Sequence, residues 1–263
     1  MSSEQQSLSD RVALITGVSR TNGIGFAVAR RLGQMGAKLF LHGWPANDLQ
    51  YAENPNAVGP YVAERLRSEG LAVEYVERDF TDPQAPEQVV AAAVEAYGHI
   101  DILDANHAYA RPDRLDTLDA VELDKHLLVN VRGSIMLVKA FAAQHDGRPG
   151  GRVIMMTSGQ HLGSGTSEIS YMVSKGAIHQ ATRNLSATLI PRGITVNTVN
   201  PGPVDTGYAT GERWQDVLAR MPLGRWGQPD DTAKLIAWLC TDDAQLMTGQ
   251  VINFEGGFRH RWG

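Results

Sequence analysis

The sequence predicts an α/β fold: a single domain with a doubly wound parallel sheet and helices on both of its faces. Two observations carry this prediction. Short, continuously apolar segments alternate with segments of helical periodicity along most of the 263 residues, and apolar runs of this kind are typical of parallel strands that are buried on both faces. No linker, composition shift or internal repeat divides the chain. We therefore expect one domain over residues 10–263, after a disordered N-terminal tail over residues 1–9.

The first half of the chain contains clear start and stop signals for helices. Gly36 and Gly70 follow the last periodic residue of two helical segments, where glycine readily takes the left-handed conformation that ends a helix. Pro60 suits the first turn of a helix, and residues 43–59 form a loop rich in Gly, Pro and Asn. In chain order, the expected elements are strand 12–15, helix 23–35, strand 38–42, helix 60–70, strand 71–76, helix 82–98 and strand 100–103.

The second half continues the alternation. Asp119, with Glu122 three residues later, has the pattern of a capping box at the start of a long helix. Pro191 ends the next helix, because proline has no N–H to donate and clashes with the preceding turn. The expected elements are helix 119–144, strand 152–156, helix 171–190, strand 194–199, a long loop over 206–221, helix 229–240 and strand 250–254.

Composition narrows the possible functions. The chain has 24 Lys and Arg against 29 Asp and Glu, and its basic residues form no block, so we expect no nucleic-acid partner. Cys240 is the single cysteine, which excludes an internal disulfide, and no cluster of Cys and His predicts a metal site. The polar start, Met1–Ser9, lacks the apolar core of a signal peptide, and no apolar run is long enough to span a bilayer. We expect a cytoplasmic protein without a metal ion or a membrane partner.

A glycine-rich turn follows the first expected strand directly. It comprises Thr16–Gly25 and opens the first helix. Glycines let the backbone turn tightly and approach a pyrophosphate, and the helix behind them offers free N–H groups and the positive end of its dipole. Such a turn can also serve strand–helix packing alone, but its place between a strand and a helix favours a dinucleotide. The residues expected to contact a cofactor here are Gly17, Ser19, Arg20, Asn22, Gly23, Ile24 and Gly25.

A tyrosine and a lysine in helix 171–190 have the spacing of an acid–base pair. Tyr171 and Lys175 stand four residues apart, so their side chains share one face of that helix. A free tyrosine has a pKa of about 10, and a neighbouring ammonium favours the phenolate and lowers that pKa. Ser158 follows strand 152–156 at the edge where ligands bind in such sheets, so its hydroxyl can hold a substrate oxygen beside Tyr171. Taken alone, the tyrosine and the lysine also fit an ordinary pair on a helix surface.

Together, the motifs of this chain resemble those of classical short-chain dehydrogenases/reductases, and in particular 3-oxoacyl-acyl-carrier-protein reductases. The resemblance extends from about Arg11 to Phe258. It rests on segments in the family's order and spacing: Thr16–Gly25, Asp79, Asn106, Asn130, Ser158, Tyr171, Lys175, Asn200–Gly202 and Thr248–Gln250. It implies a Rossmann-type fold and an oxidoreductase that transfers a hydride between NADP(H) or NAD(H) and a carbonyl or secondary-alcohol carbon, with a tyrosine as general acid or base.

The resemblance also implies roles for individual residues. The catalytic residues are Asn130, Ser158, Tyr171 and Lys175, and Asn130 anchors a water that links Lys175 to solvent. As an alternative, Asn130 is a buried polar group that holds backbone segments together. The further cofactor contacts are Gly43 and Trp44 after the second strand, Asp79 and Phe80 beside the adenine, Asn106 and Ala108 after the fourth strand, Tyr171 and Lys175 in the helix, and Pro201, Gly202, Val204 and Thr206 at the nicotinamide.

The segment after the second strand bears on the choice of cofactor. Members of this fold that prefer NAD place an acid there to accept the ribose hydroxyls, whereas this chain has His42-Gly43-Trp44. Arg20 in the glycine-rich turn can pair with a 2′-phosphate, although it also fits a solvated surface arginine. We expect NADP(H) to be the preferred cofactor, with NAD(H) as the alternative.

Two features depart from the classical pattern. Five residues separate Gly17 from Gly23, where the classical turn has three, and the longer turn resembles enoyl-acyl-carrier-protein reductases of the same superfamily. Those enzymes usually space tyrosine and lysine seven apart, whereas Glu168 stands seven before Lys175, which weighs against reduction of a C=C bond. The usual Asn-Asn-Ala-Gly after the fourth strand is replaced by Ala105-Asn106-His107-Ala108, which puts the bracing of that strand in doubt and adds a histidine that is either packed or catalytic.

The substrate pocket should lie beyond the carboxyl ends of the strands. We expect walls from Tyr109, from residues 160–162 and from the loop 206–221, whose Gly207 and Gly211 act as hinges of a mobile lid. The expected substrate-binding residues are Ser158, Gln160, Tyr208 and Trp214, although Trp214 also fits a role in packing.

The loop over residues 206–221 also indicates the charge of the substrate. Arg213 and Arg220 are its cations, and they face either water or a substrate carboxylate. We expect the former, and hence an uncharged carbonyl compound with an apolar body.

Two other functions stay open at this point. One is a redox sensor that binds a dinucleotide without catalysis; such proteins tend to lose the tyrosine or the lysine, whereas this chain keeps Tyr171 and Lys175. The other is a lyase such as a halohydrin dehalogenase, in which the nucleotide site is filled, whereas this chain keeps the glycine-rich turn.

The resemblance further implies a homotetramer. Helices 119–144 and 171–190 would form one interface, and the C-terminal segment would form another. The apolar face of the first of these helices fits purely internal packing as well, and it comprises Leu127, Leu128, Met136 and Leu137.

Overall fold

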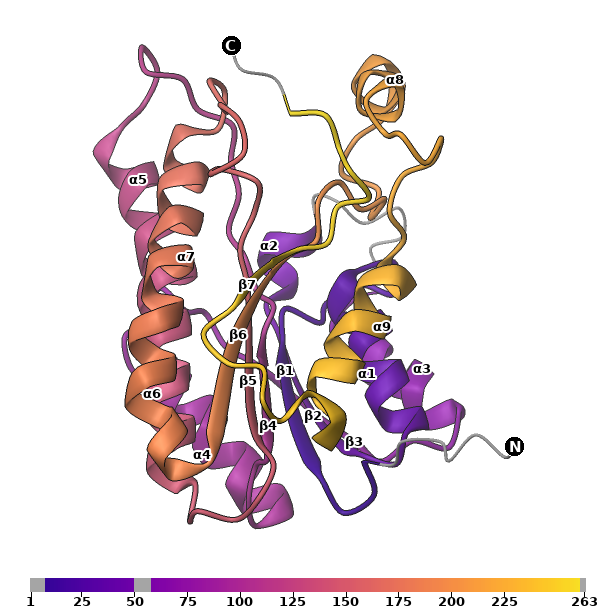
Figure 1. Ribbon diagram of the computed structural model, residues 1–263, viewed down its shortest axis with the longest axis vertical. Coiled ribbons are helices and arrows are strands. Elements are labelled where there is room, and N and C mark those ends of the chain that lie inside the picture. The colour runs from indigo at the N-terminus through magenta and orange to yellow at the C-terminus, as the bar shows by residue number, and fades with distance from the viewer. Residues whose placement is uncertain (1–7, 50–57, 261–263) are drawn as a thin grey trace.

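The computed structural model describes residues 8–49 and 58–260, and its centre is a sheet of seven parallel strands (Figure 1). The strands are β1 (Val12–Thr16), β2 (Lys38–Gly43), β3 (Val73–Glu77), β4 (Ile102–Ala105), β5 (Gly151–Met156), β6 (Ile194–Asn200) and β7 (Val251–Asn253). Their order across the sheet is β3-β2-β1-β4-β5-β6-β7, so the chain starts in the middle, builds outward to β3 and then returns to the other side of β1. This order confirms the predicted doubly wound sheet.

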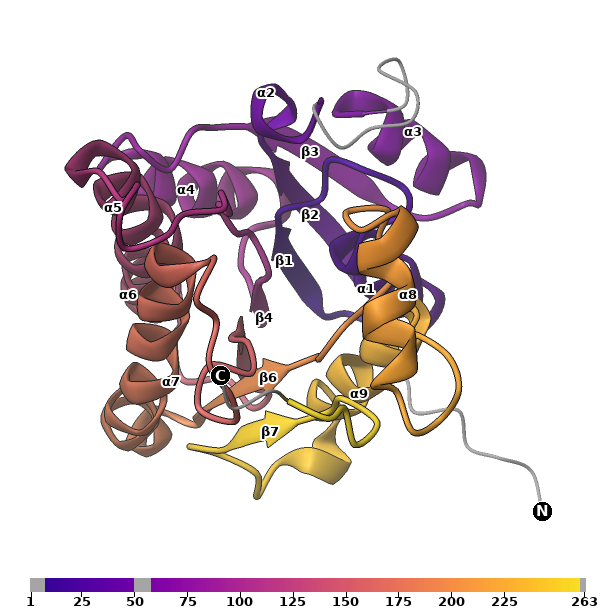
Figure 2. The ribbon, with the colours of Figure 1, turned by 90° about the horizontal axis from the view of Figure 1, so that it is seen from above.

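Helices cover both faces of the sheet (Figure 2). One face carries α1 (Ile24–Gln34), α3 (Pro60–Ser68) and α9 (Pro229–Leu239), and the other carries α4 (Ala85–Tyr97), α6 (Ser134–Gln144) and α7 (Ile169–Leu189). The shorter elements are α2 (Pro45–Asp48), α5 (Ala120–His126), a π-helix (Leu127–Gly133), α8 (Gly211–Ala219) and two 3-10 turns (Ile190–Arg192 and Asp242–Ala244).

The inner strands β1, β4, β5 and β6 bury both of their faces, which explains why they appear as continuous apolar runs in the sequence. In β1, Ala13 and Ile15 pack toward α1 and α9, whereas Leu14 packs toward α4 and α6. The same alternation places Ile102 and Leu103 of β4 on opposite sides. A fully buried leucine or isoleucine stabilises a fold by about 2 kcal/mol relative to an exposed one, so the central strands anchor two apolar cores at once.

The helical stretch expected over residues 119–144 is continuous but not uniform. It begins as predicted, with the Asp119 carboxylate accepting a hydrogen bond from the N–H of Glu122 at 2.9 Å. The segment Leu127–Gly133 then widens into a π-helix before α6 continues. π-Helical turns occur frequently at functional sites, and this one carries Asn130.

This stretch is also the one helix in the described chain with the length and composition of a membrane span. An 18-residue window within Ala120–Gln144 has a mean hydropathy of 1.2, and 44% of that window is buried inside the fold. Core helices share this composition, and α6 packs beside α4 on one face of the sheet. The feature is therefore weak evidence for a membrane.

Two elements differ from expectation for physical reasons. β4 spans Ile102–Ala105 rather than residues 100–103, because the N–H of Ile100 is bonded to the Gln144 side chain at 3.1 Å instead of to a neighbouring strand. The loop expected over residues 43–59 begins with the one-turn helix α2, and its residues 50–57 lie outside the described part.

The N-terminal tail is shorter than expected. Residues 1–7 lie outside the described part of the chain. Leu8, however, is buried in the core, and its N–H donates to the carbonyl of Met35 at 2.7 Å. Ordered packing therefore begins before residue 10, because an apolar side chain at position 8 reaches the surface of α1.

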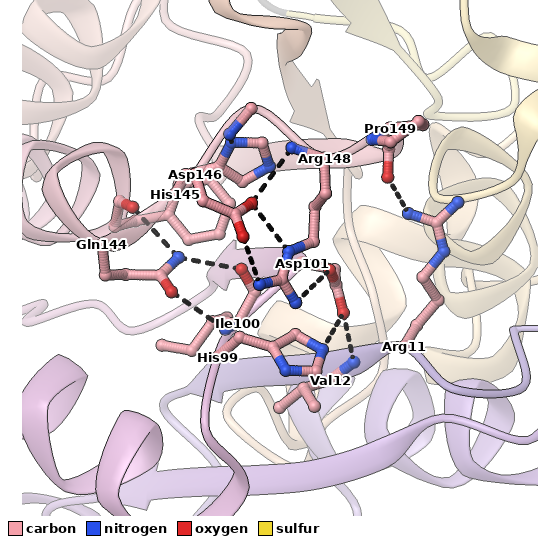
Figure 3. Close-up of polar contacts among 12 residues, drawn as sticks. Arg11, Val12, His99, Ile100, Asp101, Gln144, His145, Asp146, Arg148 and Pro149 are labelled. Carbon is pink, nitrogen blue, oxygen red and sulfur yellow. Dashed lines mark hydrogen bonds and ion pairs between the residues drawn. The ribbon is translucent and has the colours of Figure 1, made fainter.

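Polar contacts close the amino edge of the sheet, opposite the carboxyl ends of the strands (Figure 3). The buried Asp101 carboxylate accepts a hydrogen bond from the N–H of Val12 at 2.8 Å. It also lies 3.1 Å from Nε2 of His99 and 4.0 Å from a guanidinium nitrogen of Arg148. These contacts join the starts of β1 and β4 to the connection before β5, so this edge has a structural role.

One carboxyl group is buried in the core without a counterpart. Asp104 stands in β4 between Ile15 of β1 and Ile154 of β5 and is fully buried. Neither carboxyl oxygen has a hydrogen-bond partner among the described residues, and burial raises the pKa of Asp104 to about 8. The group is therefore mainly protonated at neutral pH, because an unpaired buried charge is less favourable than proton uptake.

We predict that Asp104 makes the free energy of unfolding fall as the pH rises. In the unfolded chain its pKa returns to about 3.9, so between about pH 4 and pH 8 unfolding releases a proton and the fold loses about 1.4 kcal/mol of stability per pH unit. Urea unfolding at several pH values across this range should show the slope in the wild type. Asp104→Asn, which cannot ionise, should lose it, and Asp104→Val should exceed wild-type stability at the alkaline end. Equal slopes in wild type and Asp104→Asn would refute the prediction.

Candidate active site

The carboxyl ends of β1, β4, β5 and β6 meet at one edge of the sheet, which Figure 2 shows from above. The strand order reverses between β1 and β4, because the chain builds one half of the sheet from β1 and the other half from β4. In doubly wound sheets, ligands bind in the crevice at such a reversal. The fold therefore brings the predicted cofactor and catalytic segments to a single place.

The glycine-rich turn lies against the end of β4. Gly17 has a φ of +74°, and a Cβ atom there would come within 2.6 Å of the His107 Cα, so only glycine fits. The Asn106 amide donates to the carbonyls of Thr16 and Gly17 at 3.0 and 3.2 Å, and thus braces β4 without the missing first asparagine. Behind the turn, α1 begins after Gly23 with no side-chain cap, which leaves the N–H groups of its first turn for an anion.

His107 is packed rather than placed for proton transfer. Its Nδ1 is 2.7 Å from the Thr16 hydroxyl, and its Nε2 is 3.1 Å from the carbonyl of Val129. Burial, and then the nearby His42 and Lys175, hold the pKa of His107 well below the usual value, so the ring is neutral. A neutral ring with both nitrogens bonded supports the structural alternative.

Asp48 was not predicted as a site residue, but it lies beside the glycine-rich turn. Its carboxylate hydrogen-bonds the buried Ser19 side chain and is close to the charge of Arg20, and burial raises the pKa of Asp48. The N–H of Trp44 donates to the same Ser19 hydroxyl at 3.0 Å. Asp48 was overlooked because the residues directly after β2 include no acid. Pro45 could have indicated it, because proline suits the first residue of a helix, and such a helix folds back over the glycine-rich turn.

The two residues expected at the adenine lie in the turn after β3. Phe80 is 3% exposed and its ring is stacked on His42, with 4.2 Å between the centroids, so it can meet a ligand only through its backbone. Asp79 accepts a hydrogen bond from the N–H of Thr81 at 2.9 Å, which shapes the turn after β3. Ala108 is exposed after β4, where a wall of the crevice was expected.

Ser158, Tyr171 and Lys175 come together at the end of β5. Tyr171 and Lys175 lie on α7, and the Lys175 ammonium is 5.6 Å from the centroid of the Tyr171 ring. Ser158 follows β5 by two residues, and its side chain hydrogen-bonds Tyr171. The buried Lys175 donates from Nζ to the carbonyl of Met156 at 3.0 Å, which holds the ammonium in place. Two of the predicted catalytic residues, Ser158 and Lys175, thus lie beside the phenol of a third, Tyr171.

Burial moves the pKa values of this pair in opposite directions. It raises the pKa of Tyr171 above its usual value; Glu168 and Tyr208 add to this effect, and the bond to Ser158 opposes it. Burial lowers the pKa of Lys175 to about 8. Burial therefore acts against the predicted lowering of the Tyr171 pKa, because the loss of solvation disfavours the charged phenolate. At neutral pH, Tyr171 holds its proton and most Lys175 is charged.

Asn130 is fully buried in the π-helix. Its amide nitrogen donates to the carbonyl of Tyr109 and to Ser174 Oγ, both at 2.9 Å, and its Oδ1 accepts from the N–H of Tyr109 at 2.6 Å. These bonds tie the chain after β4 to α7, close to Tyr171. They support the alternative in which Asn130 joins backbone segments rather than the water-anchoring role.

The segment after β6 is tied to the glycine-rich turn. Arg20 Nη1 and Asn22 Nδ2 both donate to the carbonyl of Thr206, at 3.0 and 3.1 Å. The Val204 side chain is buried, so Val204 can meet a ligand only through its backbone, whereas residues 201–202 are partly exposed. The crevice is therefore bounded by the glycine-rich turn on one side and by this segment on the other.

The segment expected to form a lid builds a small apolar cluster of its own. Trp214 of α8 is stacked on the buried Trp226 with 5.9 Å between the ring centroids, and its Nε1 donates to Asp205 at 3.2 Å. Trp214 thus packs within the segment, as the alternative role required. Tyr208 is 42% exposed, yet it lies close enough to Tyr171 to raise the pKa of that residue.

Polar side chains around the expected substrate pocket already have partners among the described residues. The Gln160 amide, expected to bind substrate, folds back instead, so that its Oε1 accepts from the N–H of Ser158 at 3.2 Å. Arg213 pairs with Glu168 at the start of α7 at 2.8 Å, and Arg220 pairs within α8 at 3.1 Å. The pairing of both arginines agrees with the expectation that they do not bind a substrate carboxylate.

The C-terminal segment reaches the same edge, which was not predicted. The His260 ring packs against Gly159, next to Ser158, and Glu255 packs against Gly202. β7 is parallel to β6, so the chain that follows β7 must leave the sheet at its carboxyl edge. That topological argument was the available signal, because no motif marks this segment.

Comparison of sequences identifies similar proteins over almost the whole chain. Residues 17–259 match a family model described as Enoyl-(Acyl carrier protein) reductase. An uncharacterized oxidoreductase of Bacillus subtilis, YjdA, is 39% identical over 95% of this chain and 97% of its own length. Human dehydrogenase/reductase SDR family member 4 is 32% identical over 95% of this chain and 88% of its own length.

Two solved structures have the same arrangement of strands and helices. A short chain dehydrogenase from Burkholderia cenocepacia, in complex with NADP, matches with a TM-score of 0.83 at 31% identity, over 95% of this chain and 98% of that one. A blue fluorescent protein from a metagenomic library, in complex with NADPH, matches with a TM-score of 0.84 at 30% identity, over 96% of this chain and 99% of that one.

Proposed function

The chain is an oxidoreductase that belongs to the short-chain dehydrogenase/reductase family, and we propose that it transfers a hydride between NADP(H) and a carbonyl or secondary-alcohol carbon, with Tyr171 as acid or base. The observation that carries this proposal is the meeting of Ser158, Tyr171 and Lys175 at the carboxyl edge of the sheet, beside the glycine-rich turn.

The crevice fits a dinucleotide. The close approach of Gly17 to His107 and the uncapped start of α1 suit the pyrophosphate. Ser19 and Arg20, in the same turn, suit a 2′-phosphate. We assign Thr206 and residues 201–202, which border the crevice after β6, to the nicotinamide end. The two similar structures with NADP and NADPH add support. When bound, the cofactor supplies the hydride.

The chain's own residues handle the proton. In the reducing direction, the hydroxyls of Ser158 and Tyr171 lie together and can both donate to a ketone oxygen. The raised pKa keeps the proton on Tyr171 until that oxygen gains negative charge, and the Lys175 ammonium then stabilises the phenolate that remains. The alcohol has gained a hydride at carbon and a proton at oxygen. Alcohol oxidation uses the same groups in reverse.

The spacing of the catalytic pair supports C=O rather than C=C reduction. The matching family model is described by an enoyl reductase, but Lys175 follows Tyr171 by four residues on the same helix, not by seven. The intact pair also weighs against a redox sensor, and the intact glycine-rich turn weighs against a lyase.

We further propose an uncharged, apolar carbonyl substrate. Both arginines of the α8 segment are paired with acids of the chain itself. The cluster around Trp226 gives this segment an apolar body, and Tyr208 is exposed near Tyr171. Gly207 and Gly211, at the N-terminal side of α8, both have a positive φ, which suits hinges there.

Tyr171→Phe should bind NADPH normally and lose turnover by about two to four orders of magnitude, because only the proton path is removed. The assay follows NADPH absorbance with a panel of ketones and, in parallel, enoyl thioesters. Tyr61→Phe, at an exposed position on α3, is the matched control and should behave as wild type. Near-normal ketone turnover in a folded Tyr171→Phe protein would overturn the role of Tyr171, and wild-type turnover of enoyl thioesters alone would overturn the C=O assignment.

Cofactor preference should respond in opposite directions to two substitutions. Arg20→Ala should weaken NADPH far more than NADH, because it removes the partner of the 2′-phosphate. Asp48→Asn should strengthen NADPH relative to NADH, because it removes a negative charge next to Ser19 and Arg20. Fluorescence titration with both cofactors measures the ratio of dissociation constants. A wild type without preference, or the same direction of change in both variants, would contradict the proposal.

We propose a homotetramer in the cytoplasm. Exposed apolar side chains lie on the expected interface helices, at Val121 of α5 and Val173 of α7, whereas Leu137 belongs to the internal core. The C-terminal part carries a second exposed set, Leu246 and Phe254. Light scattering at micromolar concentration should give about four times 28.6 kDa, and Val173→Glu should lower this mass. A monomeric wild type would end the proposal.

A further inference from the structure

The segment after β7 crosses the carboxyl edge of the sheet. In Figure 1 it rises from β7 between α7 and α8, past the ends of β5 and β6. It contacts the two loops that carry the proposed chemistry: the turn after β5 with Ser158, and the loop after β6 with Gly202. Both contacts are made at a glycine, where the two segments come closer than a larger residue would allow.

Glu255 is bonded to the loop after β6. A Cβ atom on Gly202 would lie 2.3 Å from the Glu255 Cβ, so the two backbones touch directly. The Glu255 carboxylate accepts a hydrogen bond from Asn200 Nδ2 at 2.7 Å, and Asn200 Oδ1 accepts one from the N–H of Gly202 at 3.1 Å. Asn200 thus links the carboxylate to the loop expected at the nicotinamide.

His260 lies on the turn after β5. A Cβ atom on Gly159 would lie 2.3 Å from the His260 Cε1. The ring is held by Glu255, whose two oxygens lie 3.0 and 3.1 Å from Nε2, and by an edge-on contact with Phe258 at 4.9 Å between centroids. The Arg220 guanidinium carbon lies over the Phe258 ring, 4.6 Å from its centroid. The imidazole is therefore fixed in one orientation.

Resting on the proposed function, we propose that Glu255 and His260 form a clasp that couples the Ser158 turn to the loop after β6, and that His260 is a positioning residue that acts through Ser158. Thr157 is bonded to β6, but the N–H of Ser158 is held by the Gln160 side chain at 3.2 Å rather than by a strand. The ring of His260 blocks outward movement of that turn. A displacement of about 1 Å at a reacting group can reduce turnover up to about a hundredfold.

Steady-state kinetics with a ketone and NADPH test the clasp. His260→Leu keeps the bulk but removes the bond to Glu255, and it should lower kcat about tenfold while the NADPH dissociation constant stays within about twofold. His260→Gln retains a donor that reaches Glu255 and should recover most of the kcat. Glu255→Leu should lower kcat in the same way and also weaken NADPH, because it releases the loop at Gly202 as well. Arg259→Ala, at an exposed neighbouring position, is the control and should match wild type.

The coupling to Ser158 is tested in a second background. If His260 acts through Ser158, adding His260→Leu to Ser158→Ala should cause no further loss of kcat. A further tenfold loss in the double variant would overturn the mechanism, and so would an unchanged kcat in His260→Leu or a failure of His260→Gln to restore it.

Hydrogen exchange tests the clasp without any substrate, so that its failure and the failure of the proposed function are distinguishable. In His260→Leu, the backbone amides of residues 158–160 should exchange about tenfold faster than in wild type, while those of β1 and β4 should not change. If the wild type reduces no ketone, this local increase still supports the clasp, and the reaction alone is wrong. Unchanged exchange at residues 158–160, or an equal increase throughout the sheet, would overturn the clasp whatever the activity.

Discussion

The parallel direction of the seven strands is the constraint on which the site depends. Because neighbouring strands run in the same direction, every segment that follows a strand emerges at one edge. The glycine-rich turn, Asn106, Ser158 and Thr206 follow β1, β4, β5 and β6, and so become neighbours although they are far apart in the chain. The segment after β7 obeys the same rule, which brings His260 to Gly159. An antiparallel strand at any of these places would carry its group to the opposite edge.

Burial is the second determinant, and its effect depends on the partners that a buried group finds. Lys175 loses solvation, and its pKa falls to about 8, yet its ammonium gains the carbonyl of Met156. Tyr171 loses solvation, so its proton stays on the phenol, although the hydrogen bond to Ser158 partly opposes this effect. Asp104 has no such partner in the described chain and accepts a proton instead. The same loss of water thus prepares a proton donor in one place and weakens the fold in another.

Local signals predicted the elements well because each strand and helix carries its own pattern. Continuous apolar runs located the strands, and the spacing of Tyr171 and Lys175 placed both side chains on one face of a helix. The groups that were missed are defined by contacts between distant segments. Asp48 reaches Ser19 only because α2 folds back, and Gln160 turns toward Ser158 only because the turn after β5 is compact. The pKa of Tyr171 moved against expectation because its burial is a tertiary property that spacing does not contain.

The contacts at the carboxyl edge divide into two kinds that differ in strength. At Gly17, Gly159 and Gly202, backbone or ring atoms approach so closely that any side chain would separate the partners, and movement there would leave unfilled space in a packed interior. The contact between α8 and the start of α7 is instead the exposed ion pair of Arg213 and Glu168, and exposed pairs of this kind contribute less than about 1 kcal/mol. α8 also packs, through the cluster around Trp226, against Phe258 of the C-terminal segment, which ties α8 to that segment more firmly than to α7. If α8 acts as the proposed lid, its contact with α7 is therefore the one that would open with the least loss of free energy, while the catalytic turn stays in place.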